Sequence, residues 1–190
     1  TCALPILRAR NEIDFWRGVA LLTIFVNHIP GNAFEAWTYK NIGYSDAAEV
    51  FVFLAGWSTR LVARSALRDH SMLHVALRLE ARAATIYFAQ IFVASVALAM
   101  TAAGALLLSD PLILEWNNAA VMFGSPIEAQ IGLVLLSHQL NYFDILPLYV
   151  VLVAIAPAIV LIDRFSGWAL FAVSGAAYVA TLWSGTNIPT

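Results

Sequence analysis

The chain has 190 residues, of which 61% are hydrophobic and 12% are charged, and its formal net charge is −2 at pH 7. Soluble domains carry about 25% charged residues, so this composition excludes an ordinary soluble protein and predicts a polytopic membrane protein. The single cysteine, Cys2, excludes a disulfide framework and a cysteine-paired metal site.

The first predicted transmembrane span runs from about Ile13 to Ile29 and carries Asp14, Arg17, Asn27 and His28 in an otherwise apolar sequence. An ionisable group at membrane depth is costly and is a functional candidate by default. Arg17 and His28 are eleven residues apart, which at ~100° per residue puts them on one face of a helix, about 16 Å apart along its axis. We therefore expect both side chains to face one interior column.

The second span is predicted from about Ala47 to Val62. A basic stretch then runs from Arg60 to Arg82, and its recurring arginines predict a surface-lying amphipathic helix that leads into the third span. That third span, from about Ala83 to Leu108, is long enough to cross a bilayer with tilt.

Residues 112–142 have a mixed pattern in which a short apolar run begins at Pro126. The run is short for a full crossing, so we predict an interfacial or re-entrant helix. The fourth span is predicted from about Ile145 to Ile162, a tight turn at 163–167, and the fifth span from about Trp168 to Trp183. The predicted fold is all-α: a polytopic integral membrane helical bundle of about five transmembrane helices plus an external interfacial helix, in one domain over residues 1–190.

The basic residues predict the orientation. Nine of the ten lie in the lead-in, the first span, the loop between spans two and three, or the turn between spans four and five, and only Lys40 falls on the opposite side. By the positive-inside rule the amino terminus is then cytoplasmic and residues 112–142 are external. The number of predicted spans is odd, and the sequence stops abruptly after the fifth. We therefore expect the chain to be the amino-terminal half of a longer protein.

Four sequence blocks carry a family resemblance. The D-x-x-R-G context and R-x10-H spacing of the first span resemble the signature of the acyltransferase-three superfamily of membrane acyltransferases. Together, DFWRGVALLTIFVNHIPGN, NIGYSDAAEVFVFLAGW, RAATIY and YFDILPLY, spread over roughly Arg10 to Asp163, resemble the OpgC family. That family is associated with succinylation of osmoregulated periplasmic glucans.

The resemblance implies an O-acyltransferase of the bacterial inner membrane. It would move an acyl group, succinyl by family association, from the co-substrate acyl-CoA to hydroxyls of a periplasmic glucan. Nothing in the sequence independently selects a dicarboxylic donor. The expected partners are the lipid bilayer, acyl-CoA and the glucan, with no nucleic acid, no permanently bound cofactor and no metal. The oligomeric state is left open.

The residues suggest roles in such a reaction. Neutral imidazole is well suited to take a proton from a hydroxyl near neutral pH, so His28 is the expected general base. Asp14, which could pair with Arg17 or with another cation, is the second catalytic candidate. Arginine matches phosphate oxygens in a bidentate way, so Arg17, Arg82 and Arg78 are candidates for coenzyme A binding. The superfamily often carries an R-x-x-R element before its third span. In this chain the pair is Arg78-x-x-x-Arg82, so only Arg82 lies in a matching local sequence.

Asp144 and Asn27 are candidates for binding the acceptor, although Asp144 could equally be a favourable charge at a helix amino terminus. His28 could instead hydrogen-bond a backbone carbonyl at its helix end, and Arg17 could snorkel to the head groups. His70 and His74 lack an evident third metal ligand.

Three other functions stay open. The acceptor could be another envelope glycan. The polar column could serve a transporter or exporter without covalent chemistry, although the sequence has no inverted repeat of the kind many transporters carry. The chain could also be a non-enzymatic membrane module, which would tolerate loss of His28.

Overall fold

The computed structural model describes residues 12–29, 31–38, 46–141 and 143–185. Over these residues the chain forms eight α-helices and one 3-10 helix, with no strand, which confirms the all-α prediction. Cys2, Arg10 and Lys40, used in the sequence analysis, lie outside the described residues. The chain divides into two compact units, Thr1–Arg68 and Asp69–Thr190.

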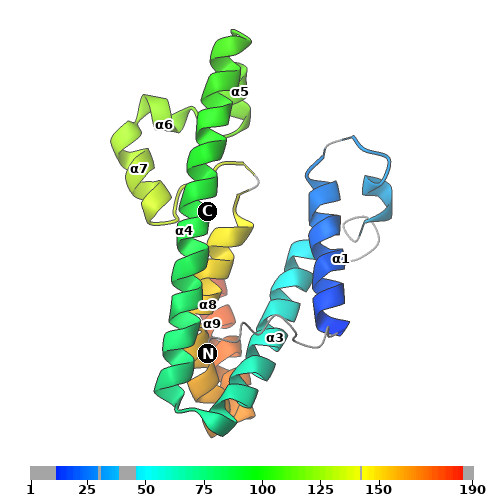
Figure 1. Cartoon of the computed structure of the whole chain (residues 1–190), viewed down its shortest axis with the longest axis vertical. Coiled ribbons are helices and arrows are strands. Elements are labelled where there is room, and N and C mark those ends of the chain that lie inside the picture. Colours follow the sequence, from blue (N-terminus) through cyan, green and yellow to red (C-terminus); the bar gives the residue numbers. More distant parts are fainter. Residues whose placement is uncertain (1–11, 30, 39–45, 142, 186–190) are drawn as a thin grey trace, which may run out of the picture. The chain divides into compact units, whose positions relative to one another are not determined.

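The first unit contains α1 (Glu12–Asn27), the 3-10 helix η1 (Glu35–Trp37) and nearly all of α3 (Ala47–Asp69) (Figure 1). The 16 residues of α1 extend about 24 Å, slightly less than the ~30 Å hydrocarbon core of a bilayer. α3 begins at Ala47, as predicted, but continues past Val62 because its second half consists mostly of good helix formers such as alanine, arginine and leucine.

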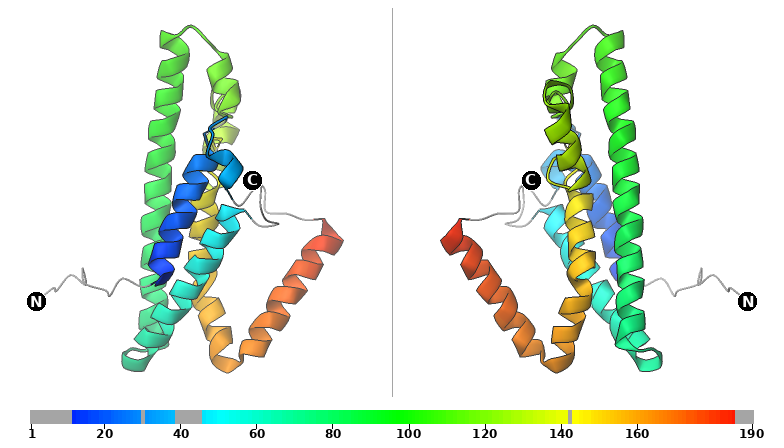
Figure 2. Two further views of the ribbon diagram at one scale, coloured as in Figure 1. Left: turned by 90° about the vertical axis from the view of Figure 1, so that its right-hand side faces the viewer. Right: turned by 90° about the vertical axis from the view of Figure 1, so that its left-hand side faces the viewer.

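The second unit is built on α4 (Met72–Leu107), a helix of 36 residues. It is followed by the short helices α5 (Leu112–Trp116), α6 (Val121–Gly124) and α7 (Pro126–Val134), and then by α8 (Ile145–Phe165) and α9 (Gly167–Ser184). α8 lies alongside the amino-terminal half of α4, and α5 to α7 lie beside the other half (Figure 1). Figure 2 shows α9 slanting away from α8, and no residue of α9 is buried.

The interface between α4 and α8 is the main core of this unit. Its buried residues are mostly small or β-branched: Val75 and Ala83 on α4, and Val150, Val153, Ala156 and Val160 on α8. Small side chains let two helices approach closely, which is how helices associate when lipid removes much of the hydrophobic driving force. Gln90, on α4, is the exception to this apolar interface and is 1% exposed.

The prediction of a separate amphipathic helix over Arg60–Arg82 is wrong. Those residues form the end of α3 and the beginning of α4, with a break only at His70 and Ser71. Ser71 caps α4, because its hydroxyl accepts a hydrogen bond from the backbone N–H of His74 at 3.3 Å. The arginines mark a polar surface, but they are good helix formers and do not end either helix.

After α4, the helix boundaries differ from the predicted ones in two further places. Residues 112–134 hold three short helices, of which only α7 was predicted, and α7 begins at Pro126 as expected. The predicted turn at 163–167 is almost entirely helical, since α8 extends to Phe165 and α9 begins at Gly167. Only Ser166 separates them, with extended backbone at φ −167° and ψ 129°.

Four helices of the described chain are long and apolar enough to cross a membrane: α3, α4, α8 and α9. The protein is therefore a membrane protein with four candidate spans, one fewer than predicted. The missing one is α1, whose 16 described residues fall short of the ~20 that a crossing normally uses.

Candidate functional site

The polar residues of α1 make specific contacts in the first unit. An oxygen of the Asp14 carboxylate lies 3.7 Å from Nη1 of Arg17, one turn along the helix, which confirms the predicted pairing. The Arg17 guanidinium also lies over the ring of Phe51 on α3, 5.5 Å from its centroid, in a cation–π contact. Arg17 Nε is buried with no hydrogen-bond partner among the described residues. The Arg17 guanidinium thus contacts two other residues of the first unit, Asp14 and Phe51.

His28 follows the last residue of α1, and its backbone N–H still bonds to the Ile24 carbonyl. Its ring nitrogen Nδ1 lies 2.6 Å from the same carbonyl oxygen. A carbonyl can only accept, so Nδ1 carries the proton, and in the neutral ring Nε2 is then the nitrogen with the lone pair. This backbone contact was predicted from the sequence as an alternative to a catalytic role for His28. The same contact also selects the tautomer that a general base needs, with the proton on Nδ1 and the lone pair on Nε2.

Asn27 is connected to the start of α3. Its side-chain Nδ2 donates to Oδ1 of Asp46 at 3.4 Å, and the same carboxylate oxygen accepts from the backbone N–H of Ala47 at 2.6 Å. Asn27 Oδ1 is buried without a partner in the described part of the chain. Asp46 thus joins the end of α1 to the beginning of α3.

Arg82 has a partner on another helix of the second unit. Its Nη2 donates to the hydroxyl of Tyr149 on α8 at 3.2 Å. Arg82 is exposed, and no carboxylate of the described chain is paired with it. Arg78, one turn earlier on α4, is also exposed.

A cluster of amide side chains lies between α4 and the segment that leads into α8. Gln90 Nε2 donates to Gln139 Oε1 at 3.2 Å and to the Phe143 carbonyl at 3.3 Å. Asn118 donates to the Gln139 carbonyl at 2.9 Å. Gln90 Oε1 and His138 Nε2 are buried and have no partner among the described residues. Such a buried polar network orders the segment before α8, since unmade hydrogen bonds are costly there.

Asp144 lies at the amino-terminal cap of α8, where its side chain is exposed and makes no capping hydrogen bond. The negative charge is still favourable beside the positive end of the helix dipole. The acceptor role of Asp144 stays a prediction. Asp144, Arg78 and Arg82 belong to the second unit, whereas Asp14, Arg17, Asn27 and His28 belong to the first.

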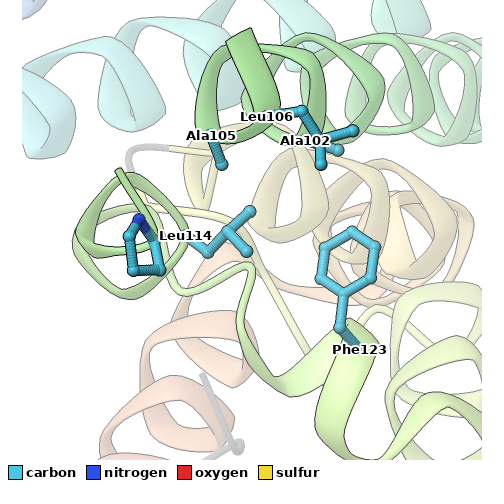
Figure 3. Close-up of a pocket in the computed structure, with 6 residues that line it drawn as sticks. Ala102, Ala105, Leu106, Leu114 and Phe123 are labelled. Atoms are coloured by element: carbon cyan, nitrogen blue, oxygen red, sulfur yellow. The ribbon is translucent and has the colours of Figure 1, made fainter. Parts of the chain in front are cut away.

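A pocket of about 270 Å³ lies among α4, α5 and α6 (Figure 3). It is lined by Ala102, Ala105, Leu106, Pro111, Leu114 and Phe123. These side chains offer no hydrogen-bonding group, so the pocket is unsuited to phosphates or sugar hydroxyls. Across the described residues, no group of three His, Cys, Asp or Glu side chains is arranged to hold a metal ion.

Comparison with known families assigns the chain. The family model described as OpgC protein matches residues 9–190. The chain belongs to the OpgC family. The resemblance read from the four sequence blocks is thereby confirmed and covers nearly the whole chain. No curated protein and no solved structure matches it. Membership of the OpgC family implies an OpgC-like acyltransferase, in a family associated with glucan succinylation.

Sequence reasoning missed three residues with a clear place in these sites. Phe51 and Tyr149 are the partners of Arg17 and Arg82, and partners far apart in sequence leave no local signal. Gln90 could have been found, because it is a lone amide in an apolar run and the rule used for α1 applies to it equally.

Proposed function

We propose that this OpgC family member transfers an acyl group, succinyl by family association, from acyl-CoA to hydroxyls of a periplasmic glucan, with His28 as general base. α1 would be a fifth span, with its amino terminus at the cytoplasmic face of the bacterial inner membrane. The observation that carries the mechanism is the hydrogen bond from His28 Nδ1 to the Ile24 carbonyl. It supports an imidazole held in one orientation, with Nε2 as its basic atom.

The chemistry needs one base and no metal. As the sugar oxygen attacks the thioester carbon, its proton passes to His28 Nε2. The carbon–sulfur bond then breaks, and the departing thiolate takes that proton from the imidazolium. The products are a glucan ester and free coenzyme A, and His28 returns to its neutral form. A fixed base contributes about 10²–10⁴-fold to the rate of such a step.

Arg17 is proposed to bind the phosphates of the donor. The Asp14 contact and the Phe51 ring hold the Arg17 guanidinium in place, and a held guanidinium loses less entropy on binding an anion. Asp14 acts as a positioning residue in this proposal. Asn27, held by Asp46, and Asp144 are proposed as acceptor contacts, since carboxylates and amides hydrogen-bond sugar hydroxyls.

The test uses the full-length protein in cells that lack their own glucan-modifying acyltransferase. Wild type, His28→Ala and His28→Gln are compared at equal membrane levels, with His74→Ala as a matched control, since His74 is an exposed histidine at the start of α4. The mass and the anionic charge of extracted glucans are measured. We expect wild type and His74→Ala to add the acyl mass, and both His28 variants to lose at least about 100-fold in rate.

If both His28 variants modify glucan normally, the assignment of His28 is wrong and its hydrogen bond is structural. If wild type releases coenzyme A but leaves the glucan unmodified, the acceptor is another envelope glycan. A wild-type protein that consumes no acyl-CoA at all would refute the acyltransferase proposal and favour an exporter.

A further inference from the structure

A membrane that surrounds α8 along its whole length contains the pair formed by Arg82 and Tyr149. α8 has 21 residues and extends about 31 Å, which matches the ~30 Å hydrocarbon core. Tyr149 is four residues from the first residue of α8 and sixteen from the last, so it is about 6 Å from one end of the span and about 24 Å from the other. The Arg82 guanidinium bonds to its hydroxyl and shares that level.

An arginine at this depth calls for an anion. A charged side chain within a membrane is costly and is normally paired, yet the tyrosine hydroxyl is neutral and no described carboxylate pairs with Arg82. The guanidinium has five N–H donors, of which one contacts Tyr149. Because Arg82 is exposed, the remaining donors are accessible to a ligand.

An acyl-CoA can carry negative charge on its phosphates and on the end of its acyl group. The position of the Arg82–Tyr149 pair along α8 indicates which of these anionic groups it can reach. With the proposed orientation, the amino-terminal end of α8 is on the acceptor side, and the donor's phosphates stay at the cytoplasmic face, about 24 Å away along α8. The acyl end must reach toward the acceptor side, because the glucan is there. An anion carried on the acyl group therefore suits this level better than the phosphates do.

We infer that Arg82, held by the Tyr149 hydroxyl, binds the terminal carboxylate of a dicarboxylic acyl group such as succinyl and so selects that donor over uncharged acyl groups. This inference rests on the proposed acyltransferase function, and it moves Arg82 from the phosphates of coenzyme A to the acyl end. A planar guanidinium binds a carboxylate through two parallel hydrogen bonds. A site built to bind such a group discriminates strongly against a ligand that lacks it.

The test compares two donors on purified full-length protein in lipid nanodiscs. Succinyl-CoA carries a terminal carboxylate, and butyryl-CoA has the same four carbons ending in a methyl group. Acyl transfer to glucan gives kcat/KM for each donor, and thermal unfolding with each donor, without glucan, gives binding. The variants are Arg82→Gln, Arg82→Lys and Tyr149→Phe. Arg164→Gln is the control, because Arg164 is an exposed arginine in the last turn of α8.

We expect Arg82→Gln to lower kcat/KM for succinyl-CoA by about 10- to 100-fold, the size of one lost charge-assisted interaction, and to leave butyryl-CoA within about twofold. Arg82→Lys should retain part of the preference, because lysine keeps the charge without the planar fork. Tyr149→Phe should lower succinyl transfer by roughly 3- to 10-fold, since it removes one neutral hydrogen bond. Arg164→Gln should match wild type.

The inference is overturned if Arg82→Gln weakens both donors equally, which would assign Arg82 to the phosphates or to packing. It is also overturned if the variant keeps the wild-type preference, or if wild type has none. If succinyl-CoA selectively stabilises wild type but not Arg82→Gln, while glucan is not acylated, the inference stands and the acceptor proposal fails. If no acyl-CoA stabilises wild type, the inference and the proposed function fail together.

Discussion

Among the described glycines of the second unit, Gly132 on α7 is the one at which an added Cβ would meet neighbouring atoms. The chain after α7 doubles back on this residue, and the backbone N–H groups of Ser137 and His138 both bond to the Gly132 carbonyl, at 2.8 and 3.0 Å. A Cβ added at Gly132 would lie 2.7 Å from the Cβ of His138. That distance is too short for two carbon atoms, and a Cβ is not the end of a flexible side chain. Gly132→Ala must therefore move the 135–138 backbone.

The magnitude follows from three terms. Overpacking costs roughly 1–3 kcal/mol, and displacing the returning chain loses about one backbone hydrogen bond, worth about 1 kcal/mol. Against this, alanine is a better helix former than glycine by about 0.5–1 kcal/mol. The expected net loss in the free energy of unfolding is about 1–3 kcal/mol. His138, whose Nε2 is buried, should become more accessible.

The matched control is Gly175→Ala on α9, where an added Cβ meets nothing within 4 Å. The same substitution should there be neutral or stabilising by up to about 1 kcal/mol. Unfolding of the full-length variants in mixed micelles, followed by tryptophan fluorescence, gives the difference. If Gly132→Ala is as stable as Gly175→Ala, the contact between α7 and the 135–138 chain is absent, and so is the ordering it gives to His138.

Two further predictions concern buried contacts and use the same unfolding assay. Gln90→Leu leaves two acceptors, Gln139 Oε1 and the Phe143 carbonyl, without their donor, so it should lower the free energy of unfolding by about 1–3 kcal/mol. The control, Gln130→Leu on the exposed face of α7, should change it by less than about 0.5 kcal/mol. Equal effects of the two substitutions would contradict the amide cluster. A double-mutant cycle of Arg17→Gln and Phe51→Leu should give a coupling of about 0.5–2 kcal/mol for the cation–π contact, and additive effects would show that the ring does not bind the guanidinium.

Much of the fold could be predicted because apolar length and helix breakers are local signals. The starts of α3, α7 and α8, at Ala47, Pro126 and Ile145, were predicted correctly. The Asp14–Arg17 pair was also predictable, since residues three apart share a helix face. The boundaries over Arg60–Arg82 were predicted wrongly, because charged residues indicate an exposed surface and not where a helix ends.

The partners of the polar residues could not be predicted from sequence alone. Arg82 and Tyr149 are 67 residues apart, and Gln90 and Gln139 are 49 apart. Which of them meet depends on how far α8 is shifted along α4, and that shift is set by packing of small residues along the whole interface. His28 differs because its partner, Ile24, is one turn away, so its backbone contact was foreseen.

The register between α4 and α8 decides where the α4 arginines lie. Arg82 meets Tyr149 and Gln90 meets the Phe143 carbonyl, so the two helices run antiparallel, and Arg78 lies one turn further along α8 from its amino-terminal end. α8 has exposed apolar side chains from Leu146 to Leu161, so its whole length requires contact with lipid or protein. A membrane placed around α8 therefore includes both arginines, although the positive-inside rule counts them as loop residues.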